Sequence, residues 1–236
     1  MDLNTISRVA IIGAMDEEVA HIAESMQDVT TRTHASLTLT EGTIPGAHGA
    51  GIGVVATVSG MGTVNAASAT QVLADLYQPD AIIFSGIAGN LNPTLRINDV
   101  VLGGTLRYLD TDMRLVAQSA PGTEEFHSDP DLLGVADAAL DAMGINHITG
   151  VIASGDYFVA GDELVAKVKE QTGADAVEME GAAVAHIAAR NGVPSLVIRA
   201  LSDEANVEYE EFRTFDISEY ADTAAKLVVS IVRRLG

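Results

Sequence analysis

The chain of 236 residues contains no cysteine and no tryptophan, and aromatic residues make up only 4% of it. The absence of cysteine excludes disulfides, thiolate catalysis and thiolate metal sites. Because aromatic side chains are few, Ala, Val, Ile and Leu must fill the core, and the hydrophobic fraction of 47% suffices to build one. This composition favours strands and helices that alternate along the chain and pack as layers.

Basic residues are also scarce, with 13 Lys and Arg against 33 Asp and Glu and a net charge of −20. Nucleic acids and anionic membranes are bound by basic surfaces, so we expect neither as a partner. No apolar run reaches membrane-spanning length, and no basic segment followed by an apolar one marks a signal peptide. We therefore expect a cytoplasmic protein whose acidic excess serves solubility.

Apolar runs alternate with amphipathic helical patterns from one end of the chain to the other. Strands are predicted at 8–15, 81–89, 99–108 and 194–203, and helices at 16–26, 63–77, 129–144, 162–173 and 217–235. This order predicts the α/β class, with a mixed, mostly parallel central sheet flanked by helices. No linker or repeat divides the chain, so we expect one domain over residues 1–236.

Polar and glycine residues stand where several predicted strands end. In open α/β sheets, ligands bind beyond the carboxyl ends of the strands. We therefore expect acidic groups from three distant segments, together with one arginine, to meet in one crevice. The four strand ends are Met15-Asp16-Glu17-Glu18, Ser85-Gly86-Ile87-Ala88-Gly89, Glu178-Met179-Glu180 and Arg199-Ala200-Leu201-Ser202-Asp203, and all but the second carry acidic residues.

Such a group of carboxylates suits the cleavage of a sugar–nitrogen bond. One carboxylate can accept hydrogen bonds from the vicinal hydroxyls of a ribose. A second can orient and deprotonate water, and a third, when protonated, can donate to the leaving base. The transition state resembles an oxocarbenium ion with a departing base, and it needs all three roles.

Each of these residues has a plainer alternative, which the sequence leaves open. Glu18 and Glu180 could have no role beyond placing a negative charge at the N-termini of the helices that follow them, where it complements the helix dipole. Asp203 could cap a turn, and Arg199 could pair with a buried carboxylate. Glu178 lies on the same side of an extended strand as Glu180, so support of the site or an ion pair is the more natural role for it than direct catalysis.

Metal and cofactor binding find little support in the sequence. The histidines show no metal-ligand spacing, and His186, inside an Ala-rich helix, is predicted to be a packed or partly exposed residue and not a metal ligand. The Gly-rich segment 59–67 opens a helix and could hold an anion, but it matches neither a phosphate loop nor a dinucleotide fingerprint. We therefore expect no metal and no cofactor.

Several motifs together resemble one known family. "AIIGAMDEEV", "SGIAGNL", "ASGDYFV", "VEMEGAAVAH" and "VIRALSD" occur in the order and spacing seen in the 5′-methylthioadenosine/S-adenosylhomocysteine nucleosidases of the nucleoside phosphorylase superfamily. The resemblance implies a single-domain, three-layer nucleoside phosphorylase-like fold, paired as a homodimer. It also implies hydrolysis of the bond between adenine and a 5′-thio-substituted ribose, without metal or cofactor, in methionine salvage.

The resemblance assigns catalytic roles to four residues. Glu18 matches the carboxylate that activates water, and Asp203 matches the acid that protonates adenine N7. Glu180 matches the residue that holds the ribose hydroxyls, and Arg199 matches an arginine near the water site. The expected substrate-binding residues are Met15, Ala88, Gly89, Phe158, Val159, Met179 and Ser202.

Two segments depart from the family pattern. Where some members carry serine in the Gly-rich turn, this chain carries Ile87. In several members an aromatic-containing loop of the partner subunit covers the 5′-substituent, whereas the corresponding region here, 111–129, has few aromatic residues. The preferred 5′-substituent therefore stays open.

Two other functions remain as alternatives. A phosphate-dependent purine nucleoside phosphorylase of the same fold must hold phosphate, usually with several arginines. Here the acidic segment 16–18 stands at the expected nucleophile position, where it would repel phosphate and suit water. A nucleoside-binding protein without activity is the third possibility, but three candidate catalytic carboxylates argue against it.

Overall fold

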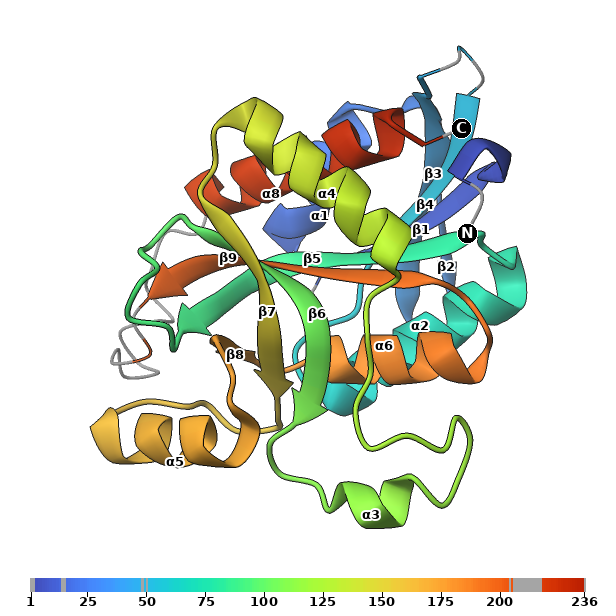
Figure 1. The fold of residues 1–236 in the computed structure, drawn as a ribbon. Coiled ribbons are helices and arrows are strands. Elements are labelled where there is room, and N and C mark those ends of the chain that lie inside the picture. The colour runs from blue at the N-terminus through green and yellow to red at the C-terminus, as the bar shows by residue number, and fades with distance from the viewer. Residues whose placement is uncertain are drawn as a thin grey trace.

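The computed structural model describes residues 3–13, 16–47, 49, 51–203, 205 and 218–235. Within them, nine strands form one sheet in the order β2-β3-β4-β1-β5-β8-β7-β6-β9 (Figure 1). The strands are β1 Arg8–Gly13, β2 Gln27–His34, β3 Leu37–Pro45, β4 Gly51–Val58, β5 Ala81–Asn90, β6 Val100–Tyr108, β7 His147–Ser154, β8 Ala176–Glu178 and β9 Ser195–Asp203. The helices are η1 Leu3–Thr5, α1 Asp16–Glu24, α2 Thr63–Tyr77, α3 Met113–Val116, α4 Pro130–Met143, α5 Asp162–Thr172, α6 Gly181–Arg190 and α8 Ser218–Arg233.

The sheet is mixed, and more of its pairings are parallel than antiparallel. The parallel pairs are β1–β4, β1–β5, β5–β9, β6–β7 and β7–β8, and the antiparallel pairs are β2–β3, β3–β4, β5–β8 and β6–β9. The predicted mixed, mostly parallel sheet is therefore confirmed. Because β5 pairs with both β8 and β9, the strands β5, β8, β7, β6 and β9 close into a ring, which the sequence did not predict.

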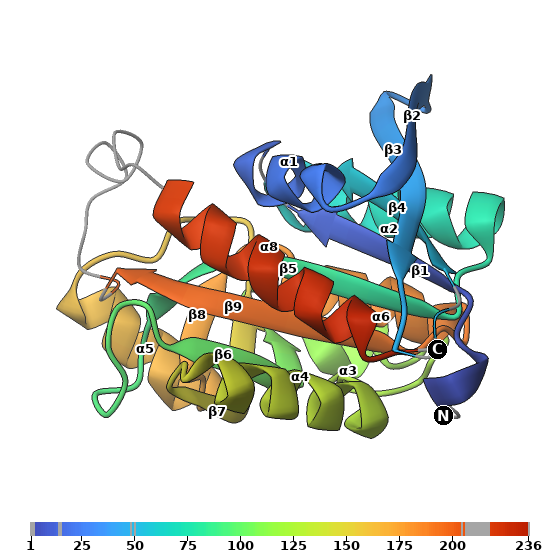
Figure 2. The same cartoon turned by 90° about the horizontal axis from the view of Figure 1, so that it is seen from above.

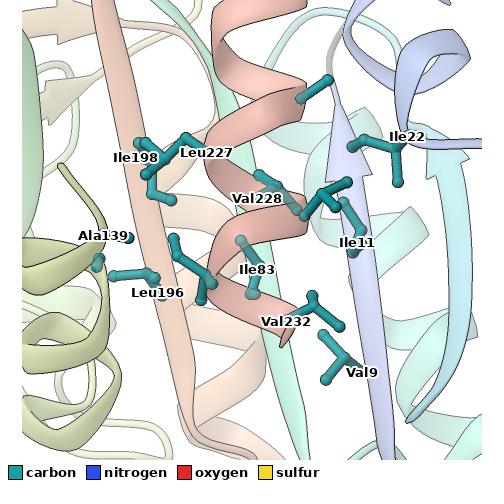
Figure 3. Packing of buried hydrophobic residues seen from close by; sticks show 14 of the residues in the cluster. Val9, Ile11, Ile22, Ile83, Ala139, Leu196, Ile198, Leu227, Val228 and Val232 are labelled. Atoms are coloured by element: carbon teal, nitrogen blue, oxygen red, sulfur yellow. The ribbon is translucent and has the colours of Figure 1, made fainter. Parts of the chain in front are cut away.

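Helices cover both faces of the sheet, because successive residues of a strand point to opposite sides. On β1, β5 and β9, the side chains of Val9, Ile11, Ile83, Leu196 and Ile198 pack in one cluster with residues of α1, α4 and α8 (Figure 3). The alternate residues Ala10, Ile12, Ile82, Phe84 and Val197 belong to a second cluster with α2 and α6. Figure 2 shows α8 running along β5 and β9 on the first of these faces. The arrangement is the expected three-layer one.

The helices are those of a layered globular fold. In the part of the chain that the structure describes, no helix is both long enough and apolar enough to cross a membrane.

Candidate active site

Residues from β5, β8 and β9 meet at one row of the sheet. Gly89 of β5 is paired with Val177 of β8 on one side and with Asp203 of β9 on the other. Ala88, the preceding residue, is paired with Leu201. Three of the predicted segments are thus brought together as expected, although they are far apart in the sequence.

Arg199 is a fully buried cation at this junction, with an exposed fraction of 0%. Its Nη2 lies 2.5 Å from Oε2 of Glu178 and 3.6 Å from Oε2 of Glu180. Its guanidinium carbon lies 4.0 Å from the centroid of the Phe84 ring, in cation–π geometry. The alternative in which Arg199 pairs with a buried carboxylate is therefore confirmed, and the ion pair expected for Glu178 is present.

Glu180 is buried and stands at the start of α6, as its position in the sequence suggested. Its side chain nevertheless makes no capping hydrogen bond to that helix. Instead, its Oε1 accepts a hydrogen bond of 2.8 Å from the backbone N–H of Gly62, at the start of α2. Glu180 therefore stands at the N-terminus of α6, as the plainer alternative has it, but does not cap the helix by a hydrogen bond. The neighbouring Met179 is half-buried.

Asp203 ends β9 and holds two hydrogen bonds. Its Oδ2 accepts from the backbone N–H of Ala205 at 2.8 Å, so the turn-capping alternative holds for this oxygen. Its Oδ1 accepts from the hydroxyl of Ser202 at 2.9 Å, and that hydroxyl also lies 3.3 Å from the carbonyl oxygen of Ala88. One hydroxyl hydrogen serves both acceptors, so Oδ1 is the less firmly engaged oxygen of the carboxylate.

The loop between β7 and α5 lies beside the end of β9. The backbone N–H of Gly161 donates to the carbonyl oxygen of Ala205 at 3.3 Å. Val159 is buried in the same apolar cluster as Ala205, and Phe158 before it is half-buried. The loop expected to contact adenine is therefore placed next to Asp203, the expected proton donor.

Two of the predicted site residues, Met15 and Glu18, have side chains that the structure does not describe. Met15 lies outside the described residues, and nothing is described of the side chain of Glu18, although α1, which carries it, begins at Asp16. Ile87, the departure in the Gly-rich turn, is partly buried against the apolar cluster beneath α8.

The start of α2 is occupied by carboxylates of this chain. Besides the bond from Gly62 to Glu180, the backbone N–H of Thr63 donates to Oδ1 of Asp156 at 2.7 Å, and its hydroxyl donates to Oδ2 at 2.5 Å. These donors are the ones that would hold a phosphate at a helix N-terminus. Asp156 belongs to the motif "ASGDYFV", but its contact with Thr63 was not predicted, because the two residues are 93 positions apart.

A small aromatic group of Tyr108, Phe126 and His186 packs where β6 meets α6. The His186 ring stacks on Phe126 with centroids 4.5 Å apart, and its Nδ1 lies 3.3 Å from the Tyr108 hydroxyl. Burial lowers the pKa of His186, with Arg190 adding to the effect, whereas burial and the charges of Asp156 and Glu178 raise the pKa of Tyr108. The prediction that His186 is a packed or partly exposed residue is confirmed, because its ring is stacked and half-buried. Across the described residues, no group of three or more His, Asp or Glu side chains is arranged to bind a metal ion.

The sequence matches the model of the phosphorylase superfamily over residues 8–233. It is 36% identical over 240 residues to a 5′-methylthioadenosine/S-adenosylhomocysteine nucleosidase of Halalkalibacterium halodurans, covering 98% of this chain and 100% of that one. The crystal structure of a nucleosidase of the same description from Neisseria meningitidis, in complex with methylthio-immucillin-A, superposes with a TM-score of 0.87 at 33% identity, covering 97% and 99% of the two chains.

A second solved structure shows that the fold also serves another named hydrolase. The futalosine hydrolase of Helicobacter pylori superposes with a TM-score of 0.84 at 29% identity, covering 96% of this chain and 97% of that one. The match over nearly the whole length decides the family. The chain belongs to the 5′-methylthioadenosine/S-adenosylhomocysteine nucleosidases of the phosphorylase superfamily.

Proposed function

We propose that this protein hydrolyses the N-glycosidic bond of 5′-methylthioadenosine, S-adenosylhomocysteine or a related adenine nucleoside, and releases adenine and the 5′-substituted ribose. The observation that carries the proposal is the junction of β5, β8 and β9, where Glu180 and Arg199 are buried 3.6 Å apart and the buried Ser202–Asp203 pair ends β9. Full-length similarity to nucleosidases with this substrate description supports it.

Asp203 is the proposed acid that protonates adenine N7 as the glycosidic bond breaks. Its Oδ1 shares one hydroxyl hydrogen with the carbonyl oxygen of Ala88, so it can exchange that contact for one to the base. The loop that carries Phe158 and Val159 lies beside it, which suits stacking on adenine and contact with its edge. Protonation of N7 makes the base a better leaving group.

Glu180 is the proposed acceptor for the ribose hydroxyls, with Met179, Ala88 and Gly89 around the sugar. The amide of Gly62 holds one of its oxygens, and the nearby charge of Arg199 favours the ionised form, which accepts hydrogen bonds best. Arg199 thus lies as one buried cation beside two carboxylates, those of Glu178 and Glu180.

Water is the proposed nucleophile, activated by Glu18, with Met15 near the substrate. The carboxylates of Glu180 and Asp156 already take the amide donors at the start of α2, where a phosphate could otherwise bind. These negative charges would repel phosphate, which disfavours the phosphorylase alternative.

We also propose that the protein forms a homodimer. Two apolar side chains at the start of α2, Met61 and Val64, are 49% and 77% exposed. They flank Gly62, which holds Glu180, so a second copy of the chain that covers them would stand beside the site. Exposed apolar groups next to a functional site are typical of a surface that another protein covers.

The direct test is a substrate panel with release of free base as the readout. The panel contains 5′-methylthioadenosine, S-adenosylhomocysteine, 5′-deoxyadenosine, adenosine and inosine. We expect adenine release from the 5′-substituted nucleosides and much slower cleavage of inosine. Binding of these compounds without any base release would contradict the proposal and favour a binding protein.

A further inference from the structure

Glu178 is a buried acid at the site that accepts several hydrogen bonds, and the proposed mechanism does not use it. Its Oε1 accepts from the hydroxyl of Ser154. Its Oε2 accepts from the backbone N–H groups of Glu180 at 3.0 Å and Gly181 at 2.7 Å. The same oxygen accepts from Nε and Nη2 of Arg199 at 3.2 and 2.5 Å. A buried carboxylate is tolerated only when such donors compensate for lost hydration.

These bonds cap α6 from the preceding strand. The first N–H groups of a helix have no partner within it and are usually satisfied by the side chain at the N-cap. Here Glu180 is the N-cap residue, with φ −140° and ψ −37°, and its side chain makes no capping bond. Glu178 accepts from two of the amides instead, and the Ser154 hydroxyl accepts from a third, that of Ala182, at 2.8 Å.

The same carboxylate also fixes the guanidinium that faces Glu180. Nη2 of Arg199 is 2.5 Å from Glu178 but 3.6 Å from Glu180. The closer pair therefore belongs to Glu178, and the Phe84 ring covers one face of the guanidinium. Glu180 accepts a hydrogen bond from the amide of Gly62, and the guanidinium of Arg199 lies just beyond hydrogen-bond distance of it.

We infer that Glu178 is a positioning residue that holds the groups around Glu180 and so sets the position of the Glu180 carboxylate for the substrate. It takes the capping amides and the close contact with Arg199, both of which would otherwise draw Glu180 away from the ribose. The inference rests on the proposed function, in which Glu180 accepts the ribose hydroxyls. In this division of roles, Glu178 acts only through Glu180 and Arg199 and does not touch the substrate.

The test compares how strongly variants discriminate between 5′-methylthioadenosine and its 2′-deoxy and 3′-deoxy analogues, measured as the ratio of kcat/KM values. The wild type should prefer the natural ribose strongly. In Glu178→Gln, which keeps the shape but removes the charge, Arg199 is free to pair closely with Glu180. We expect the discrimination to fall about tenfold or more, with KM rising more than kcat falls.

The pH profile gives a second readout that a loss of folded protein would not change. Removing the charge of Glu178 takes a negative group away from Glu180, so Glu180 should ionise at lower pH. We expect the acidic limb of kcat/KM to move to lower pH in Glu178→Gln and to return toward the wild-type position in Glu178→Asp, which restores the charge. The Asp variant also serves if the Gln variant does not fold.

A matched control is Glu125→Gln, which removes the carboxylate of the partly exposed Arg107–Glu125 pair, 2.7 Å long. It should leave both discrimination and pH profile unchanged. A wild type that does not discriminate would refute the role of Glu180 in the proposed function. A wild type that discriminates, with a Glu178→Gln variant that keeps the same ratio and the same acidic limb, would refute the inference alone.

Discussion

Asp203 illustrates how one residue can combine a structural and a chemical role. One oxygen caps the turn at Ala205, and the other shares the Ser202 hydroxyl. In Asp203→Asn an amide replaces the carboxyl group and cannot transfer a proton to N7. We predict that turnover of adenine nucleosides falls by several orders of magnitude, while the thermal midpoint changes by only a few degrees.

The measurement is steady-state adenine release together with thermal unfolding of the same preparation. Ser202→Ala is the companion variant, because it removes the hydroxyl partner but keeps the acid. Its loss of activity should be much smaller. Near-normal turnover by Asp203→Asn would refute the role assigned to Asp203.

For single residues, family motifs and strand ends in the sequence predicted the candidate site residues. Contacts between residues that are distant in the sequence were not predicted. Glu180, Arg199 and Asp203 follow buried strands, and a residue in that place is a visible signal. Asp156 accepts hydrogen bonds from Thr63, which is distant in the sequence, so no local pattern predicts this contact. Glu178 was recognised as a supporting residue by its spacing from Glu180, but its capping of α6 needed coordinates.

Among the helices and strands, too, those with a local sequence pattern were predicted and those that depend on distant pairing were not. The predicted helix at 63–77 and the Gly144 end of α4 are confirmed, because apolar periodicity and end signals both mark them. The strand β2, Gln27–His34, was not predicted, because all its residues are exposed and no alternation of apolar and polar side chains indicates a strand. Closure of β5 to β9 into a ring depends on pairing between distant strands, which a single sequence does not encode locally.

Gly150 of β7 offers a test of how closely two elements pack. A Cβ at this position would lie 2.4 Å from Oδ2 of Asp175, which accepts from the backbone N–H of Val151 at 2.9 Å. Gly150→Ala should therefore displace Asp175 and lower the free energy of unfolding by about 2–3 kcal/mol.

The control for this change is the same substitution in α4. Gly134 is exposed, and a Cβ there would have no neighbour within 4 Å. Gly134→Ala should raise the free energy of unfolding by about 0.5–1 kcal/mol, because alanine favours the helix. Urea unfolding of both variants measures the difference, and equal stabilities would show that the close approach at Gly150 has no energetic consequence.

His147 connects the start of β7 to α4 and predicts a pH dependence. Its Nδ1 and Nε2 lie 2.9 and 3.0 Å from oxygens of Ile145 and Asp137, so both nitrogens donate when the ring is protonated. Burial alone would lower the pKa of His147, but these hydrogen bonds outweigh it and raise the pKa. A raised pKa in the folded state gives stability that is full below the unfolded pKa of about 6.5 and is lost as pH rises through the folded value.

Asp137→Asn should therefore reduce the free energy of unfolding most at about pH 5.5, by about 0.5–1 kcal/mol, and least at about pH 8. Unfolding curves of wild type and variant at several pH values give the difference directly. A difference that stays constant over this range, or grows with pH, would contradict the assignment.

At the scale of the whole molecule, the proposed homodimer can be tested by its mass in solution. If Met61 and Val64 are covered by a second copy, Val64→Asp places a charge in that interface, where it has no partner. We predict that light scattering reports twice the chain mass for the wild type and a shift toward the single chain for the variant. The rate of adenine release should also fall in Val64→Asp, because Gly62, which donates to Glu180, lies between Met61 and Val64.

The control is Val29→Asp, which changes an exposed valine of 46% accessibility on β2. It should keep both the mass and the activity of the wild type. A wild type that scatters as a single chain at micromolar concentration would refute the homodimer.

The proposed reaction transfers the ribosyl group to water and not to phosphate. Its most direct test is identification of the sugar product from 5′-methylthioadenosine in phosphate-free buffer and in buffer with excess phosphate, by mass spectrometry. We predict adenine release at the same rate in both and free 5-methylthioribose as the sole sugar product. Phosphate-dependent turnover that yields the ribose 1-phosphate would contradict it.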